Sequence, residues 1–374
     1  MKKKVPLYLH IPFCARKCHY CDFLSIATTK EKRKNYLRSL VSQIRQTEFE
    51  PYEPYTIFFG GGTPSLLESE ELLYLKQELE KKRMWQGATE ITIECNPDSI
   101  TKEKLKTYRE IGINRLSIGL QSTNSEELKL LGRIHDYETF LTTYKMARQE
   151  GFDNINIDLM SAVPKQNITS YVEGLNKILA LNPEHISSYS LIIEEGTPFY
   201  ENEEIIKLLP DEEEEREMYH KTQEILQRNG YERYEISNYA KPGKECRHNL
   251  VYWELGEYFG LGLGASSYVN EIRYKNHETF EEYEKHPTQK MEIEKIGKQQ
   301  KMEEFIFLGL RKIEGISKKE FQQLFQIPIE EIYEKVIKKY EASGFLKCNG
   351  DRIRFTPKGL DVSNQILSEF LLTV

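Results

Sequence analysis

Long apolar stretches are missing from this sequence of 374 residues. No uninterrupted apolar run approaches the roughly 18 residues that a membrane-spanning helix requires. The first residues, Met1 to Pro6, include a run of lysines and lack the apolar segment of a secretory signal peptide. We therefore expect a cytoplasmic protein, in a compartment where thiols stay reduced. Two basic patches, at 2–4 and 30–34, are compatible with peripheral contact with an anionic membrane surface or with simple solvation.

Excess positive charge is missing too. The chain has 52 Lys and Arg residues against 59 Asp and Glu residues, which gives a formal net charge of −7. This balance argues against nucleic acid as the main partner. The sequence also has no internal repeats and no low-complexity tracts. Its length predicts roughly two or three globular domains.

Cysteine is scarce, with 6 residues in the chain, but half of them fall close together. Cys14, Cys18 and Cys21 follow the pattern C-x3-C-x2-C, and the next cysteine, Cys95, is far along the chain. Thiolates at such close spacing wrap one soft metal centre in a single loop. Because iron–sulfur clusters usually have four thiolate ligands, three local ones would leave one iron of a four-iron cluster open to a small molecule.

Other interpretations of the three cysteines remain open at this point. A zinc site could take His10 or His19 as its fourth ligand, although zinc ligands usually come as two separated pairs. A disulfide with a spare thiol fits poorly with the absence of a secretory signal. Three unconnected core cysteines fit poorly with the charged Arg16 and Lys17 in the same loop. The spacing favours the iron–sulfur cluster.

The first part of the chain predicts an α/β core. Strand-like and helix-like stretches alternate from residue 5 to about 235, which indicates βα units and a parallel sheet. Six such units are too few to close a standard eight-stranded barrel, so we expect a partial barrel. The expected strands are 5–11, 55–60, 90–96, 115–121, 154–160 and 185–192, and the expected helices include 31–47, 69–83, 101–111, 136–150 and 169–181.

Three of these strands alternate apolar and polar residues, whereas a parallel strand covered on both faces should be almost wholly apolar. If helices cover the apolar side chains, the polar ones face the inside of the curved sheet, and such an interior suits a polar ligand. An antiparallel sheet with one wet face conflicts with the long helical connections. The polar positions are Thr92, Glu94, Asn96, Ser117, Gly119, Gln121, Asn156, Asp158 and Met160.

The pattern changes after Gly230. We divide the chain into a core at 1–235, a middle region with a charged linker at 236–300, and a C-terminal domain at 301–374. The middle region has few clear helix signals. The last domain combines helical stretches with a predicted hairpin around Asn349-Gly350, an arrangement that resembles a winged-helix fold. It has no dense basic stripe, so we expect a structural cap, and DNA binding is a weaker interpretation.

The run from Tyr8 to Phe23, with its three cysteines and the aromatic Tyr20, resembles the signature of the radical S-adenosylmethionine superfamily. The resemblance implies a [4Fe-4S] cluster whose open iron is chelated by the amino and carboxylate groups of S-adenosylmethionine. An electron from the cluster would then cleave this cofactor to a 5′-deoxyadenosyl radical. The resemblance also implies that the core is a partial (β/α)6 barrel.

A glycine-rich run follows the second predicted strand. Gly60-Gly61-Gly62-Thr63-Pro64 resembles the GGGTP motif that contacts the methionine amino group in that superfamily. Glycine lets the backbone approach a ligand closely, although a glycine triplet alone is as compatible with a turn. Tyr8 stands where the superfamily places a tyrosine beside the cofactor.

Four polar residues complete the expected cofactor site. Glu94 and Gln121 lie near the C-terminal ends of their strands, where barrel active sites form. A guanidinium at Arg133 suits the cofactor carboxylate, and a carboxylate at Asp158 suits paired ribose hydroxyls. The alternatives are a buried ion pair between Arg133 and Glu94, and a helix-capping role for Asp158.

A wider resemblance covers nearly the whole chain. Over this length the chain resembles the oxygen-independent coproporphyrinogen dehydrogenase family, but it differs from the decarboxylating enzymes of that family in two features. The decarboxylating enzymes carry a further cysteine where this chain has Phe23, and they have a long extension before the tyrosine strand. Both departures are typical of the HemW branch, the haem chaperones. The runs that carry the resemblance are Tyr8 to Cys21, Gly60 to Pro64, Leu131 to His135, Asp158 to Gln166 and Gly260 to Ala265.

The run His248-Asn249-Leu250-Val251-Tyr252-Trp253 matches the HNxxYW motif of that branch. Histidine is a standard axial ligand of haem iron, and Cys246 could be a second ligand or a covalent anchor. Without the resemblance, His248 is more simply an ordinary hydrogen-bonded residue and Cys246 a packed thiol. The chain has no C-x-x-C-H, so ordinary c-type attachment is excluded.

The resemblance therefore implies a haem chaperone that binds haem, a [4Fe-4S] cluster and S-adenosylmethionine. It implies membrane-bound respiratory haem proteins as acceptors, and a homodimer. The alternative is an enzyme, an oxygen-independent coproporphyrinogen III dehydrogenase that removes propionate carboxyl groups by radical chemistry. A regulator that uses the C-terminal domain is a third and weaker hypothesis.

Overall fold

A curved parallel sheet forms the centre of the computed structural model, which describes residues 2–27 and 29–372. Its strand order is β11-β1-β4-β5-β6-β7-β8-β10-β9, and the register from β1 to β8 is parallel throughout. The six expected strands are all present: β1 (Lys3–Ile11), β4 (Tyr52–Gly61), β5 (Glu90–Cys95), β6 (Arg115–Gln121), β7 (Ile155–Ser161) and β8 (His185–Ser190). The predicted fold class, an α/β partial barrel, is confirmed.

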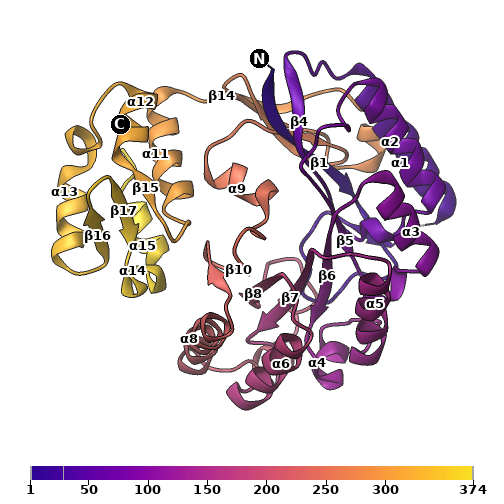
Figure 1. Cartoon of the computed structure of the whole chain (residues 1–374), viewed down its shortest axis with the longest axis horizontal. Coiled ribbons are helices and arrows are strands. Elements are labelled where there is room, and N and C mark those ends of the chain that lie inside the picture. Colours follow the sequence, from indigo (N-terminus) through magenta and orange to yellow (C-terminus); the bar gives the residue numbers. More distant parts are fainter. Residues whose placement is uncertain (1, 28, 373–374) are drawn as a thin grey trace.

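Helices follow the convex side of this sheet (Figure 1). Local signals fix their ends. Thr101 caps α3 by accepting a hydrogen bond from the Lys104 amide, and Gly112 ends it with a φ of 94°. The helices of this part are α1 (Lys30–Gln46), α2 (Ser69–Lys81), α3 (Lys102–Ile111), α4 (Ser125–Leu130), α5 (Tyr137–Gln149), α6 (Ile168–Ala180), α7 (Glu203–Ile206) and α8 (Glu212–Arg228), with short 3-10 turns at Pro64–Leu66 and Pro97–Ser99.

The two faces of the sheet differ as the alternation predicts. The apolar residues of β5, β6 and β7 belong to one large core under the helices, with Ile93, Ile118 and Ile157 fully buried. The polar residues lie on the concave side and bond to one another across strands. Asn156 Nδ2 donates to Ser117 Oγ at 2.8 Å, and the side-chain oxygen Oδ1 of Asn156 lies 2.6 Å from His185 Nδ1. The interior of the partial barrel is therefore polar.

The middle region contains more regular structure than the sequence indicates. Its short strands extend the main sheet at both edges: β11 (Phe259–Leu261) pairs with β1 in the parallel orientation, and β10 (Asn238–Ala240) pairs with β8 in the antiparallel orientation. The strand β9 (Glu232–Arg233), at the end of the core, pairs with the other side of β10. The segment 278–300, expected as a linker, carries α10 (Phe280–Lys285) and β14 (Met291–Lys295). The strand β14 joins β12 (Ser266–Val269) and β13 (Ile272–Lys275) in a small antiparallel sheet.

Helix α9 (Arg247–Trp253) is the main surprise of the middle region. The sequence offers no side-chain cap for it, because position 246 is a cysteine. The cap comes from the barrel instead: the Glu90 carboxylate accepts hydrogen bonds from the amides of Arg247 and His248, both at 3.2 Å. Figure 1 shows α9 inside the curve of the sheet, between β4 and the C-terminal helices.

The C-terminal segment has a hydrophobic core of its own, centred on Phe305, Phe321 and Tyr333. The predicted hairpin is present as β16 (Leu346–Asn349) and β17 (Arg352–Phe355), which β15 (Ile316–Ser317) completes as a small antiparallel sheet. The helices are α11 (Lys298–Gly309), α12 (Lys318–Phe325), α13 (Ile329–Ala342), α14 (Pro357–Asp361) and α15 (Ser363–Ser368). Hydrogen bonds tie this segment to the barrel side, for example Ile313 N to Tyr234 O at 3.0 Å.

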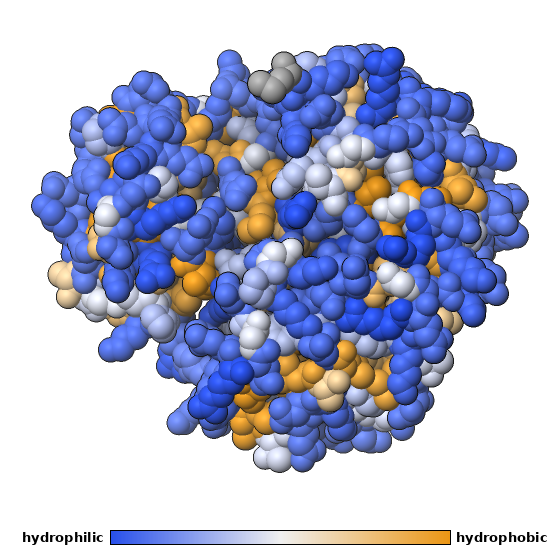
Figure 2. All heavy atoms as spheres, viewed as in Figure 1, coloured by the Kyte–Doolittle hydropathy of each residue, from blue (hydrophilic) through white to orange (hydrophobic). Residues whose placement is uncertain are grey.

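Figure 2 shows a largely hydrophilic surface on the face viewed, with scattered apolar patches. No helix within 2–27 and 29–372 is long and apolar enough to cross a membrane.

Candidate functional site

The three clustered cysteines lie on a loop that leaves the end of β1. Cys14 ends the short strand β2 (Phe13–Cys14), which pairs with β3 (Ile26–Ala27), and Cys18 and Cys21 lie on the loop between them. All three thiols are free and half-buried. Burial raises the pKa of the Cys21 thiol to about 11. A loop of this kind presents soft ligands at one end of the sheet.

The cysteine loop is held by backbone hydrogen bonds to segments that follow β6 and β8. His19 N donates to Leu131 O and Phe199 N donates to His19 O, both at 3.1 Å. Two polar side chains contact the sulfurs: Thr63 Oγ1 lies 3.7 Å from Cys14 Sγ and Arg133 Nη1 lies 3.5 Å from Cys18 Sγ. The loop conformation therefore depends on the rest of the barrel.

The zinc alternative finds little support in His10. His10 Nε2 donates to the Leu24 carbonyl at 2.8 Å, and its Nδ1 accepts a hydrogen bond from the Tyr8 hydroxyl at 3.0 Å. Both ring nitrogens of His10 are thus engaged, and burial lowers its pKa. Across 2–27 and 29–372, no three His, Cys, Asp or Glu side chains converge as ligands of a single metal ion.

The glycine run ends β4 directly beside the cysteine loop. The φ of Gly61 is +113°, and a Cβ at this position would lie 2.6 Å from the His10 ring. A Cβ at Gly62 would lie 2.8 Å from the Phe13 carbonyl oxygen. Thr63 N donates to that same carbonyl at 2.7 Å. Only glycine lets these two strands approach so closely.

Glu94 and Asp158 both lie on the polar side of the sheet and are half-buried there. The Gly61 amide donates to Glu94 Oε2 at 3.0 Å, and Asn156 Nδ2 donates to Asp158 Oδ1 at 2.7 Å. Burial, with repulsion from Asp158 second, raises the pKa of Glu94 to about 8. Burial also raises the pKa of Asp158. The barrel therefore holds two carboxyl groups that would gain from a cationic or hydrogen-bond-donating ligand.

Arg133 makes no ion pair with Glu94, contrary to one alternative from the sequence. Its Nη2 donates to Asn96 Oδ1 at 2.6 Å and to Gly119 O at 2.7 Å, while Nη1 faces Cys18 Sγ. The guanidinium thus bridges the cysteine loop and the ends of β5 and β6. Asp158 lies within β7, so it does not cap a helix either.

Four more residues line the same interior: Tyr8 and Gln121, which were expected in the site, and Tyr189 and Asn96, which were not. Tyr8 stacks on Phe58 with ring centroids 6.2 Å apart. The Gln121 side-chain oxygen accepts a hydrogen bond from the Tyr189 hydroxyl at 2.9 Å. Neither Tyr189 nor the contact from Arg133 to Asn96 was anticipated as part of the site. Asn96 could have been identified from the sequence, because it occupies a polar position of its strand, whereas no sequence feature singled out Tyr189.

His248 lies inside the barrel and not on an open loop. It is 1% exposed, with Nδ1 2.8 Å from Thr56 Oγ1 and Nε2 2.9 Å from the Tyr252 hydroxyl. Its ring also packs against Phe58, with centroids 4.9 Å apart. Burial, with Arg115 second, lowers the pKa of His248 to about 3. Neither nitrogen is free to bind a metal while α9 stays in place.

Cys246 is equally enclosed. It is 1% exposed, and its thiol donates to Glu90 Oε1 at 3.7 Å. Burial raises the pKa of Cys246 to about 12, so the thiol is a poor nucleophile and a poor metal ligand in this conformation.

Comparisons with known proteins agree along the whole chain. The Radical SAM superfamily model matches residues 8–178 and the HemN C-terminal domain model matches 296–362. The heme chaperone HemW of Lactococcus lactis is 36% identical over 100% of this chain and 98% of its own length. The heme chaperone HemW of Bacillus subtilis is 35% identical over 97% of this chain and 98% of its own length.

A solved structure shares the fold. The coproporphyrinogen III oxidase HemN of Escherichia coli, described as a radical SAM enzyme, superimposes with a TM-score of 0.88. The match covers 100% of this chain and 91% of that chain, at 22% sequence identity. At this identity the likeness concerns the fold and not the reaction.

Proposed function

The chain belongs to the HemW family of the radical SAM superfamily, and from this premise we propose that it is a haem chaperone that binds haem and passes it to acceptor haem proteins. The observation that carries the proposal is the extent of the similarity, because relatives named heme chaperone match at 32–36% identity over nearly their whole length. Phe23, in place of the further cysteine of the decarboxylating enzymes, agrees with it.

The residues of the cysteine loop fit an iron–sulfur cluster. In this proposal Cys14, Cys18 and Cys21 hold a [4Fe-4S] cluster, whose fourth iron supplies the binding site for S-adenosylmethionine. Three half-buried thiols on one loop supply one ligand for each of three irons. Replacing Cys18 with alanine should lower the iron content of anaerobically reconstituted protein from about four per chain to nearly none.

Iron and sulfide analysis, with the charge-transfer absorption of the cluster, measures this effect. Cys348→Ala is the matched control, because Cys348 lies in β16 and contacts none of the three cysteines. Full iron content in the Cys18 variant, or zinc in the wild-type protein, would contradict the assignment.

The barrel interior fits the cofactor. Glu94 would accept a hydrogen bond from the amino group, Asp158 would bind the ribose hydroxyls, and Arg133 would hold the carboxylate. Tyr8, Gly61, Gly62, Thr63 and Gln121 would line the site. The carboxyl groups of Glu94 and Asp158, which lie inside the partial barrel and have raised pKa values, carry this assignment.

The cargo and its acceptors follow from the family. We propose membrane-bound respiratory haem proteins as acceptors, and a homodimer as the working form. His248 and Cys246, expected from the sequence as haem ligands, could reach iron only after α9 had left the barrel. Light scattering with and without the cluster would test the dimer.

A transfer assay separates the chaperone from the decarboxylase. Reconstituted protein loaded with haem should restore activity to a haem-depleted, membrane-bound respiratory haem protein, and it should leave coproporphyrinogen III unchanged in the presence of S-adenosylmethionine and reductant. Formation of protoporphyrinogen with release of carbon dioxide would overturn the proposal. So would a failure to bind haem in equimolar amount.

A further inference from the structure

A cavity of about 320 Å³ lies beside the cysteine loop, outside the site described above. One wall is His19 of that loop. The others come from the end of α4 and from the segment that leads into α7, so the cavity lies at the same end of the sheet as the proposed cluster. The lining residues are His19, Lys129, Leu130, Pro198, Phe199, Asn202 and Ile205. Most of them are apolar, and one cation lies at the edge.

The hydrogen bonds of His19 define its tautomer. Nδ1 lies 2.9 Å from the Leu130 carbonyl oxygen, which can only accept, so Nδ1 carries the hydrogen. In the neutral ring the lone pair is therefore on Nε2, which has no hydrogen-bond partner among the residues that the structure describes. A histidine that donates Nδ1–H to a backbone carbonyl while Nε2 stays open is the usual arrangement of a metal-binding imidazole.

The ring of His19 is also fixed in place. It packs over Gly132, where a Cβ would lie 3.0 Å from the ring, and its centroid is 6.1 Å from that of Phe199. Backbone hydrogen bonds hold the residue on both sides, to Leu131 and to Phe199. His19 remains exposed despite these contacts. A ligand could therefore reach Nε2 without any rearrangement of the chain.

His248 offers the opposite arrangement, with both ring nitrogens bonded and the side chain 1% exposed. A haem chaperone must also release its cargo to another protein. A shallow, solvent-accessible seat allows the acceptor to approach the haem edge, whereas a ligand inside the barrel would require α9 to move twice in each cycle.

We propose that the haem iron is bound by His19 Nε2 and that the porphyrin lies in this cavity. The ring of Pro198 and the side chain of Ile205 would contact the porphyrin face, and Phe199, which is 2% exposed, would support them from the core. Lys129 would pair with a propionate, since its present partner Glu126, at 3.6 Å, forms only an exposed surface pair. The inference rests on the proposed haem-binding function and names the site for it.

Haem titration of the full-length, cluster-loaded protein tests the site. Absorption in the Soret region and electron paramagnetic resonance of ferric haem report the ligand of the iron. His19→Ala should weaken haem binding by about tenfold or more and remove the histidine-ligated spectrum. Added imidazole should restore that spectrum. His286→Ala, at an exposed histidine far from this loop in the sequence, is the matched control and should change nothing.

A second variant tests the cavity without changing the cysteine loop. Ile205→Glu, in α7, places a carboxylate on the apolar wall and should weaken haem binding by repelling the propionates, with iron and sulfide contents unchanged. Haem affinity and spectrum equal to wild type in both His19→Ala and Ile205→Glu would overturn the site while leaving the chaperone intact. Wild-type protein that binds no haem would instead overturn the proposed function itself.

Discussion

Replacing Glu94 with glutamine is expected to abolish tight binding of S-adenosylmethionine and, at the same time, to stabilise the protein at pH 8. The carboxyl group lies inside the partial barrel, where burial raises its pKa to about 8, far above the ordinary value of 4.5. Below pH 4.5 the group is protonated in both states and has no effect on folding. As the pH rises from 4.5 to 8, the unfolded chain loses this proton before the folded protein does, so the stability falls.

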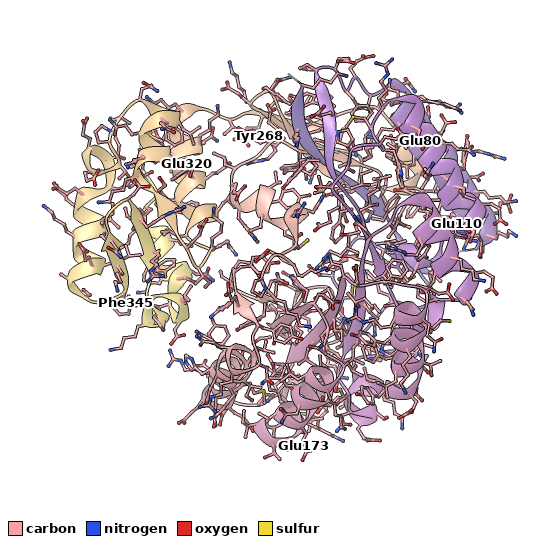
Figure 3. All side chains as sticks on the ribbon, viewed as in Figure 1. Glu80, Glu110, Glu173, Tyr268, Glu320 and Phe345 are labelled. Carbon is pink, nitrogen blue, oxygen red and sulfur yellow. The ribbon has the colours of Figure 1, made fainter. Side chains whose placement is uncertain are left out.

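Glutamine mimics the protonated carboxyl group and can keep the acceptor contact with the Gly61 amide. The variant should therefore match wild type at pH 4.5 and exceed it by a few kcal/mol, on the order of 2–4, at pH 8. Thermal unfolding of the ligand-free protein at both pH values measures the difference. Glu110→Gln, at an exposed glutamate of α3 (Figure 3), should show no such dependence on pH.

The cofactor should bind the variant at least about tenfold more weakly, because a charge-assisted hydrogen bond to its amino group is lost. In the wild-type protein, binding should tighten as the pH rises towards 8, since a proton must leave Glu94 for the contact to form. The glutamine variant should lack this component of the pH profile. Equal affinity in both proteins across this range would remove Glu94 from the cofactor site.

The fold of the core could be predicted from the sequence because the signals that specify it are local. Alternation of polar and apolar residues along β6 fixes which side chains reach the interior, and each strand carries this information by itself. The caps at Thr101 and Gly112 are likewise within a few residues of the helix that they end. Glu94 and Asp158 both occupy polar positions of this alternation, so in a parallel sheet their side chains reach the same interior.

The structure of the middle region could not be predicted because it depends on contacts with residues that are far away in the sequence. The N-terminus of α9 is capped by Glu90, which is 157 residues before Arg247 in the chain. The strands β10 and β11 have three residues each and exist by pairing with β8 and β1. A local pattern cannot report such contacts, so the helix that holds His248, and its burial, could not be predicted from the residues of this segment alone.

That burial leads to the second large effect, expected for His248→Ala. The substitution should lower the free energy of unfolding by about 3 kcal/mol, within a range of roughly 2–5. It removes a ring packed on Phe58 and leaves the hydroxyls of Thr56 and Tyr252 without their partner in the interior. His286→Ala, at an exposed position, should cost little. Thermal or urea unfolding of the reconstituted proteins gives the comparison.

Haem binding by the same variant distinguishes a structural role of His248 from ligation. If His19 binds the iron, the folded fraction of His248→Ala should keep the wild-type haem affinity and spectrum, and only its thermal stability should fall. His248→Gln offers an acceptor and a donor to Thr56 and Tyr252 and should recover part of the lost stability. A variant that folds as stably as wild type yet loses haem would show that α9 leaves the barrel and that His248 is the ligand. Whether His248→Ala loses stability or haem affinity therefore distinguishes a haem site at His19 from one at His248.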